Sequence, residues 1–97
     1  MNMMADKASI KVLVHGRVQG VYFRDFTCRK AAEFDLSGYV KNLSDGRSVE
    51  VFAEGEKESL EKLVSHLKIG PPGAAVEEVT TSYGDYTGIY NGFTIKY

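Results

Sequence analysis

The chain has little of what several protein classes require. Cys28 is the only cysteine among 97 residues, which excludes an internal disulfide and a cysteine-based zinc cluster. No apolar run approaches the roughly 18 residues that a membrane-spanning helix needs. Residues 1–7 lack the apolar stretch of a secretory signal. We therefore expect a cytoplasmic protein with no membrane partner.

The chain also has no large excess of positive or negative charge. Twelve basic and thirteen acidic residues leave a formal net charge of −1, so no overall positive field would hold nucleic acid against salt. Any anion site must be local. The length supports one domain over residues 1–97, with a flexible leader at about residues 1–7. The two histidines show no metal-ligand spacing, and we expect no metal and no cofactor.

The most informative segment runs from Gly16 to Arg24 and reads Gly-Arg-Val-Gln-Gly-Val-Tyr-Phe-Arg. Gly16 and Gly20 lack a Cβ atom, so the backbone can adopt positive φ and turn several N–H groups inward. Arg24 falls in the first turn of an expected helix, where a cation meets the unfavourable end of the helix dipole. The segment is therefore either an anion site at a helix N-terminus or a glycine-rich turn with an exposed arginine.

The order of the elements indicates the fold. β-branched alternation predicts a first strand over residues 10–15, and apolar residues at helical spacing predict a helix over about 23–34. A second strand over 36–43, a turn at Ser44-Asp45-Gly46 and a third strand over about 47–54 form an antiparallel hairpin. Leu60, Leu63, Val64 and Leu67 predict a second helix, and Gly70-Pro71-Pro72-Gly73 ends it.

Strands over 76–83 and 93–97 complete the pattern. The order β-α-β-β-α-β with a short extra C-terminal strand predicts an α+β, ferredoxin-like sandwich. In this fold an antiparallel sheet carries two helices on one face.

Asn42 is the second candidate functional residue. It shares strand parity with Gly38 and Val40 and lies just before the predicted hairpin turn. From the pattern alone, the simpler account is a strand-end or turn residue, which is the usual place of asparagine.

Two segments together resemble a known family. The loop from Gly16 to Arg24, followed by Gly38-Tyr39-Val40-Lys41-Asn42-Leu43 and Asp45-Gly46, resembles the two signature segments of the acylphosphatases. These small enzymes hydrolyse the carboxyl–phosphate bond of acyl phosphates. The resemblance extends from about Ile10 to Tyr97 and favours a small stand-alone enzyme over the similar domain of large hydrogenase-maturation proteins.

The resemblance implies roles for particular residues. The phosphoryl group would be held by Arg24 with the loop residues Gly16, Arg17, Val18, Gln19, Gly20, Val21, Tyr22 and Phe23. The attacking water would be held by Asn42, whose amide can donate to or accept from water without changing charge. The substrate would be a small acyl phosphate, and inorganic phosphate would be both product and competitive inhibitor.

Such a reaction needs few protein groups. The leaving group is a carboxylate with a pKa of about 4, so its departure at neutral pH needs no general acid. Water can attack phosphorus in line without a protein nucleophile, because phosphoryl transfer depends mainly on positioning and charge stabilisation. The family implies that a substrate oxygen takes the proton of the water. We therefore expect metal-independent hydrolysis by a monomer.

Other interpretations remain at this stage. The same loop could serve a non-catalytic, small-anion-binding regulatory module. An RNA-binding module of the same fold would need aromatic stacking residues on the third strand, which here carries Glu50. We therefore expect no nucleic-acid partner. His15 is more easily explained as a hydrogen-bonded structural residue than as a general base, and Cys28 as a packed thiol.

Overall fold

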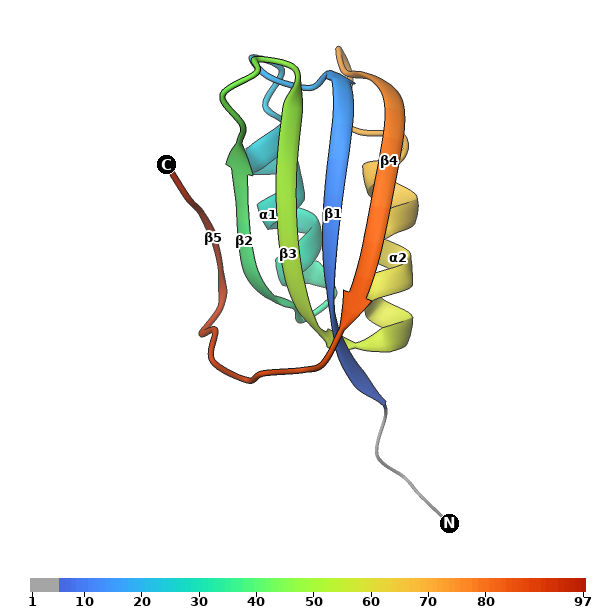
Figure 1. Ribbon diagram of the computed structural model, residues 1–97, viewed down its shortest axis with the longest axis vertical. Coiled ribbons are helices and arrows are strands. Elements are labelled where there is room, and N and C mark those ends of the chain that lie inside the picture. Colours follow the sequence, from blue (N-terminus) through green and yellow to red (C-terminus); the bar gives the residue numbers. More distant parts are fainter. Residues whose placement is uncertain (1–5) are drawn as a thin grey trace.

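The computed structural model describes residues 6–97. The chain forms five strands and two helices in the order β1 (Lys7–Arg17), α1 (Phe23–Glu33), β2 (Ser37–Asn42), β3 (Ser48–Glu56), α2 (Lys57–Leu67), β4 (Ala75–Gly84) and β5 (Phe93–Ile95). The strands form one sheet in the order β4-β1-β3-β2-β5, with both helices on one of its faces (Figure 1). The predicted ferredoxin-like α+β fold is confirmed.

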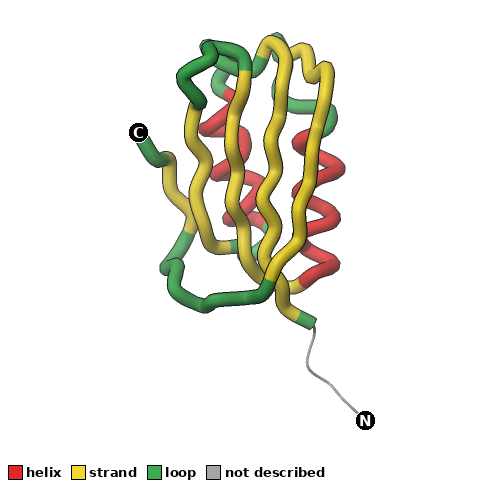
Figure 2. The backbone as a smooth tube through the Cα atoms, in the orientation of Figure 1, coloured by secondary structure: helices red, strands yellow, loops and turns green. Residues whose placement is uncertain are grey.

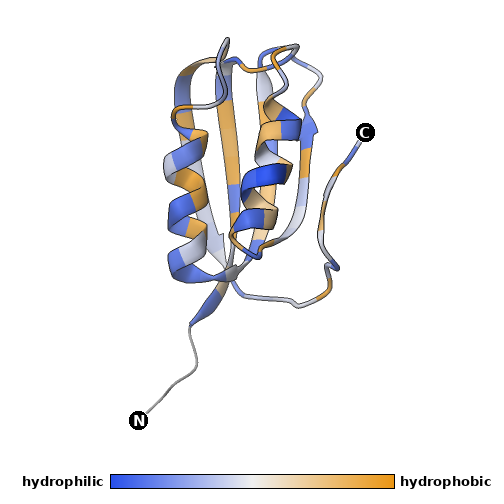
Figure 3. Ribbon diagram, turned by 180° about the vertical axis from the view of Figure 1, so that it is seen from behind, coloured by the Kyte–Doolittle hydropathy of each residue, from blue (hydrophilic) through white to orange (hydrophobic). Residues whose placement is uncertain are grey.

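The core lies between the sheet and the two helices. Every second residue of β1 and β3 points toward the helices, and among these Ile10, Val12, Val14, Val49 and Val51 are completely buried. Leu60, Leu63 and Leu67 of α2 are also completely buried, which confirms the predicted helical spacing. Figure 3 shows the apolar sides of both helices turned toward the sheet, with their charged sides turned away. This core fixes the ends of β1 and β2 relative to the start of α1.

The first strand begins earlier than predicted. β1 starts at Lys7, which pairs with Glu56, and the carbonyl of Asp6 accepts a hydrogen bond from the amide of Lys57 at 2.9 Å. The strand therefore includes the last residue of the leader predicted at about residues 1–7. Residues 1–5 of that leader lie outside the described residues.

The sheet is mixed rather than wholly antiparallel. Gly38, Tyr39 and Val40 of β2 pair in parallel with β5, the short extra C-terminal strand, for which the sequence predicted no direction. The reason is the route of the chain: after β4 at one edge, a crossing segment (residues 85–92) passes under the end of the sheet to the opposite edge (Figure 2). From that side, β5 can only run in the direction of β2.

Candidate active site

A pocket opens where β1, α1, β2 and β5 meet. Its volume is about 430 Å³, and it is lined by Val18, Gly20, Tyr22, Phe23, Arg24, Asp25, Asn42 and Ile95. The two residues that the sequence singled out for chemistry, Arg24 and Asn42, thus share one cavity. Four predicted loop residues do not line it: Gly16, Arg17, Gln19 and Val21.

The loop before α1 presents free amides at the helix N-terminus. The amides of residues 20–23 have no acceptor among residues 6–97. Gly20 has φ of 75°, as the sequence predicts, and Tyr22 also adopts left-handed backbone with φ of 63°. A non-glycine residue held in this region costs on the order of 1–3 kcal/mol, and such residues cluster at ligand sites. Free amides beside the positive end of a helix dipole form a ready-made anion site.

Gly16 has a structural task instead. Its amide donates to the carbonyl of Arg47 at 2.9 Å, so it is not free for an anion. A Cβ atom here would come within 2.2 Å of the carbonyl oxygen of Ala75 in β4. Gly16 therefore permits the close approach of β1 to β4 where the loop begins.

Arg24 is a cation that makes no ion pair within residues 6–97. It lies in the first turn of α1, as predicted, and no carboxylate within residues 6–97 lies within 4.0 Å of its guanidinium. The neighbouring Asp25 instead pairs with Arg29 at 3.3 Å, one turn along the same helix. The guanidinium carbon of Arg24 lies 5.1 Å from the centre of the Tyr97 ring, which leaves its N–H groups available to an anion.

Asn42 ends β2 on the helix side of the sheet. Its Oδ1 atom is buried and has no hydrogen-bond partner in the described part of the chain. Leaving a buried acceptor unsatisfied costs about 1–3 kcal/mol. A strand-end asparagine with a purely structural role would instead use this atom to bond the turn. The geometry therefore favours a role in the pocket.

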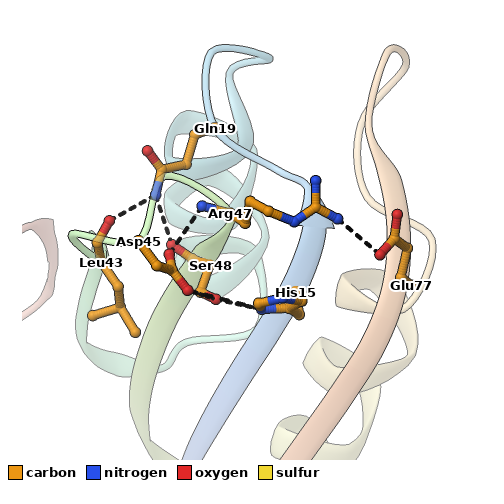
Figure 4. Close-up of polar contacts among 7 residues, drawn as sticks. All are labelled: His15, Gln19, Leu43, Asp45, Arg47, Ser48 and Glu77. Atoms are coloured by element: carbon orange, nitrogen blue, oxygen red, sulfur yellow. Dashed lines mark hydrogen bonds and ion pairs between the residues drawn. The ribbon is translucent and has the colours of Figure 1, made fainter.

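Gln19 connects the loop to the turn between β2 and β3. Its Nε2 donates to the carbonyl oxygens of Leu43 and Ser48, both at 2.9 Å (Figure 4). Leu43 directly follows Asn42, so these bonds hold the loop that leads to Arg24 against the end of the strand that carries Asn42. The structure thus shows Gln19 bonded to this turn, and its predicted place among the phosphate-binding residues stays a prediction.

A polar chain stabilises the same turn from the open face of the sheet. Asp45 accepts from the amide of Arg47 at 2.9 Å and from the Ser48 hydroxyl at 2.6 Å. Ser48 also contacts Nδ1 of His15, so His15 is hydrogen-bonded, as predicted. The Ser48 and Arg47 hydrogen bonds lower the pKa of Asp45 below its usual value. These hydrogen-bonded side chains lie on the open face of the sheet, away from the pocket.

Sequence reasoning missed three contributors to the site. Asp25 follows Arg24 directly, and this adjacency was the available signal. Ile95 reaches the pocket only through the parallel pairing of β5 with β2, for which the local sequence carries no signal. The left-handed backbone of Tyr22 was also missed, because bulky residues seldom adopt it.

Other features of the described chain bear on function. Within residues 6–97, no three His, Cys, Asp or Glu side chains gather closely enough to hold a metal ion. None of the described helices is long and apolar enough to cross a membrane. Cys28 is half-buried in α1, where desolvation, together with the nearby Asp25, raises the pKa of its thiol.

The five-stranded sheet with two helices on one face places the protein in the ferredoxin-like class of α+β sandwiches. A family model described as Acylphosphatase matches residues 10–95. The chain belongs to the acylphosphatase family. It is therefore an enzyme that hydrolyses small acyl phosphates and releases phosphate.

Curated relatives and solved structures agree. An acylphosphatase of Thermus thermophilus is 54% identical over 83 residues, which are 86% of this chain and 92% of the relative. One of Dehalococcoides mccartyi is 48% identical over 88 residues, 91% of this chain and 97% of the relative. The crystal structure of acylphosphatase from Bacillus subtilis has a TM-score of 0.88 at 37% identity, covering 93% of this chain and 99% of that one.

Proposed function

We propose that Arg24 and the loop amides hold the phosphoryl group of an acyl phosphate and that Asn42 orients the attacking water. The observation that carries the proposal is the buried Oδ1 of Asn42, which has no hydrogen-bond partner among residues 6–97 and shares a pocket with Arg24, whose guanidinium makes no ion pair in the same range. An anion would satisfy the guanidinium and the amides of residues 20–23. A water beside it would donate a hydrogen bond to Oδ1.

The bond changes follow from this arrangement. The oxygen of the water attacks phosphorus, and the bond between phosphorus and the acyl oxygen breaks in line with the attack. The electron pair leaves with the carboxylate, which is stable at neutral pH because its pKa is about 4. A phosphoryl oxygen takes the proton of the water. Arg24 and the amides stabilise the charge on the phosphoryl oxygens throughout.

The predicted loop residues differ in their parts in this proposal. Direct contacts to phosphate come from the backbone of Gly20 through Phe23 and from the Arg24 side chain, while Val18 lines the same pocket and Gly16 lets β1 approach β4. Gln19 acts through the turn, and Arg17 is exposed at the end of β1. Inorganic phosphate would compete with substrate because it presents the same oxygens to the same donors. A monomeric state and a cytoplasmic location stay predictions.

The deciding experiment measures hydrolysis of a simple aryl acyl phosphate in excess chelator, with inorganic phosphate as the inhibitor. We expect turnover that survives the chelator, competitive inhibition by phosphate, and negligible hydrolysis of simple alkyl phosphates, whose alkoxides are far more basic leaving groups. Tight phosphate binding without turnover would favour the non-catalytic anion sensor. A strict need for a divalent cation would overturn the mechanism.

A further inference from the structure

Glu54 is a buried carboxylate that the proposed reaction does not use. It lies on the open face of β3 and is only 2% exposed. Its Oε2 accepts from the amide and the hydroxyl of Thr87 at 2.8 and 2.7 Å, and its Oε1 accepts from the amide of Gly88 at 3.0 Å. No cation within residues 6–97 pairs with it. Within the described residues, the side-chain hydrogen bonds of Glu54 all come from donors of the crossing segment.

The crossing segment is fastened again beyond this attachment. The ring of Tyr90 packs on Phe52 and Tyr39, with centroid distances of 5.3 and 6.1 Å. The carbonyl of Gly92 then accepts from the amide of Gly38 at 3.0 Å, where β5 begins. Glu54 therefore provides one of a series of contacts that lead the chain to the edge of β2.

The crossing segment leads to β5, which forms one side of the pocket. β5 places Ile95 in the pocket lining, and just beyond it Tyr97 lies against the guanidinium of Arg24. A three-residue parallel strand makes few hydrogen bonds and is only marginally stable by itself. This side of the pocket therefore depends on how firmly the preceding segment is attached.

We propose that Glu54 is a positioning residue that keeps the pocket in its binding-competent form by anchoring the crossing segment. The inference rests on the proposed function, because it treats Ile95 in the pocket lining and the contact of Tyr97 with Arg24 as parts of the phosphoryl site. When the anchor is lost, residues 85–97 open locally while the rest of the sheet stays intact. The apparent affinity for phosphate then falls in proportion to the fraction of molecules in which residues 85–97 are in place. Saturating substrate binds that form and restores it, so kcat is preserved.

The test is Glu54→Gln, which keeps the size of the side chain. It replaces one carboxylate oxygen, which accepts hydrogen bonds, with an amide NH₂ group that faces the donors of Thr87 and Gly88. We expect the Kd of inorganic phosphate and the KM of the aryl acyl phosphate to rise together, by about 5- to 20-fold, with kcat nearly unchanged. Hydrogen exchange should accelerate at residues 87–96 and not in β1 or β3. Thr87→Val removes the hydroxyl that donates to Glu54 and accepts from the amide of Ile89 at 3.3 Å, but it keeps both amide donors to Glu54. It should act in the same direction and more weakly.

Leu63→Val is the matched control, because it loosens the core at α2 without touching the crossing segment. It should lower Tm and leave Kd, KM and the exchange of residues 87–96 as in the wild type. If Glu54→Gln lowers Tm and changes neither Kd nor KM, Glu54 has a merely structural role and the proposal is wrong. Should that variant not fold, the same readouts on Thr87→Val decide. Phosphate affinity and exchange keep the test valid even if the wild type shows no turnover.

Discussion

Nε2 of Gln19 lies 2.9 Å from the carbonyl oxygen of Leu43, the residue that directly follows Asn42. This hydrogen bond joins the loop before α1 to the end of β2. The two candidate functional residues, Arg24 and Asn42, lie on either side of this junction. Their relative position is thus set by a side chain that does not line the pocket itself.

The first prediction concerns this connection. Gln19→Leu keeps the volume but removes both donors, and we expect a stability loss of about 0.5–1.5 kcal/mol per hydrogen bond. Turnover should fall by about tenfold or more, because small displacements between positioned groups are costly in a reacting site. Ser44→Ala, in the same turn but exposed, should change neither quantity. Turnover of Gln19→Leu equal to the wild type would show that this connection does not position the site.

The second prediction isolates the cation. Arg24→Gln should weaken binding of inorganic phosphate by about 10- to 100-fold, because charge-assisted hydrogen bonds contribute about 1.5–3 kcal/mol each. Turnover should nearly disappear while the denaturant midpoint stays close to that of the wild type. Isothermal titration with phosphate measures the first effect. Arg29→Gln is the control, since Arg29 lies one turn further along α1 and pairs with Asp25. Unchanged phosphate affinity in Arg24→Gln would place the anion site elsewhere.

The sequence alone carried most of the fold because the signals were local. The spacing of Leu60, Leu63 and Leu67 predicts α2 directly, and Asp45-Gly46 predicts the hairpin between β2 and β3. The direction of β5 could not be obtained in this way. Its three residues are too few to show a pattern, and its pairing with β2 depends on the long route of residues 85–92.

The site residues likewise fall into those that a short stretch of sequence predicts and those that depend on distant contacts. Arg24 was suggested by its own neighbourhood, because glycines and a misplaced cation at a helix start are visible in a short window. Asn42 looked like an ordinary strand-end residue until family resemblance was considered. Only the structure reveals its orphaned oxygen and its shared pocket with Arg24. Ile95 and Glu54 were missed entirely, because their roles depend on contacts between segments that lie far apart in the sequence.

The third prediction concerns pH and the turn after β2. Since the pKa of Asp45 is lowered in the folded state by Ser48 and Arg47, the ionised carboxylate stabilises the fold. This contribution is fully present above the unfolded pKa of about 4 and is lost as the pH falls through the folded value. Asp45→Asn should therefore be less stable than the wild type at about pH 6, and the difference should shrink as the pH falls below the unfolded pKa of about 4. Urea melts across this range measure it. A difference that does not depend on pH would show that ionisation of Asp45 is not the cause.

The last prediction separates binding from chemistry at Asn42. Asn42→Ala should lower turnover by at least about 10²-fold, the scale seen when one positioned polar group is removed from a catalytic site. Phosphate affinity should change little, because Arg24 and the loop amides remain. The fold should lose little stability, and can gain some, because the variant removes a buried acceptor that has no partner in the described residues.

The structural account of Asn42 predicts the opposite combination. A residue that merely ends the strand would cost about 0.5–2 kcal/mol of stability on truncation and leave the turnover of the folded protein near normal. Denaturant melts and steady-state kinetics on the same preparation distinguish the two accounts. Asn91→Ala serves as the control, because Asn91 is exposed in the crossing segment away from the pocket lining. Near-wild-type turnover in Asn42→Ala would remove Asn42 from the mechanism and leave Arg24 and the amides as a phosphate-binding site alone.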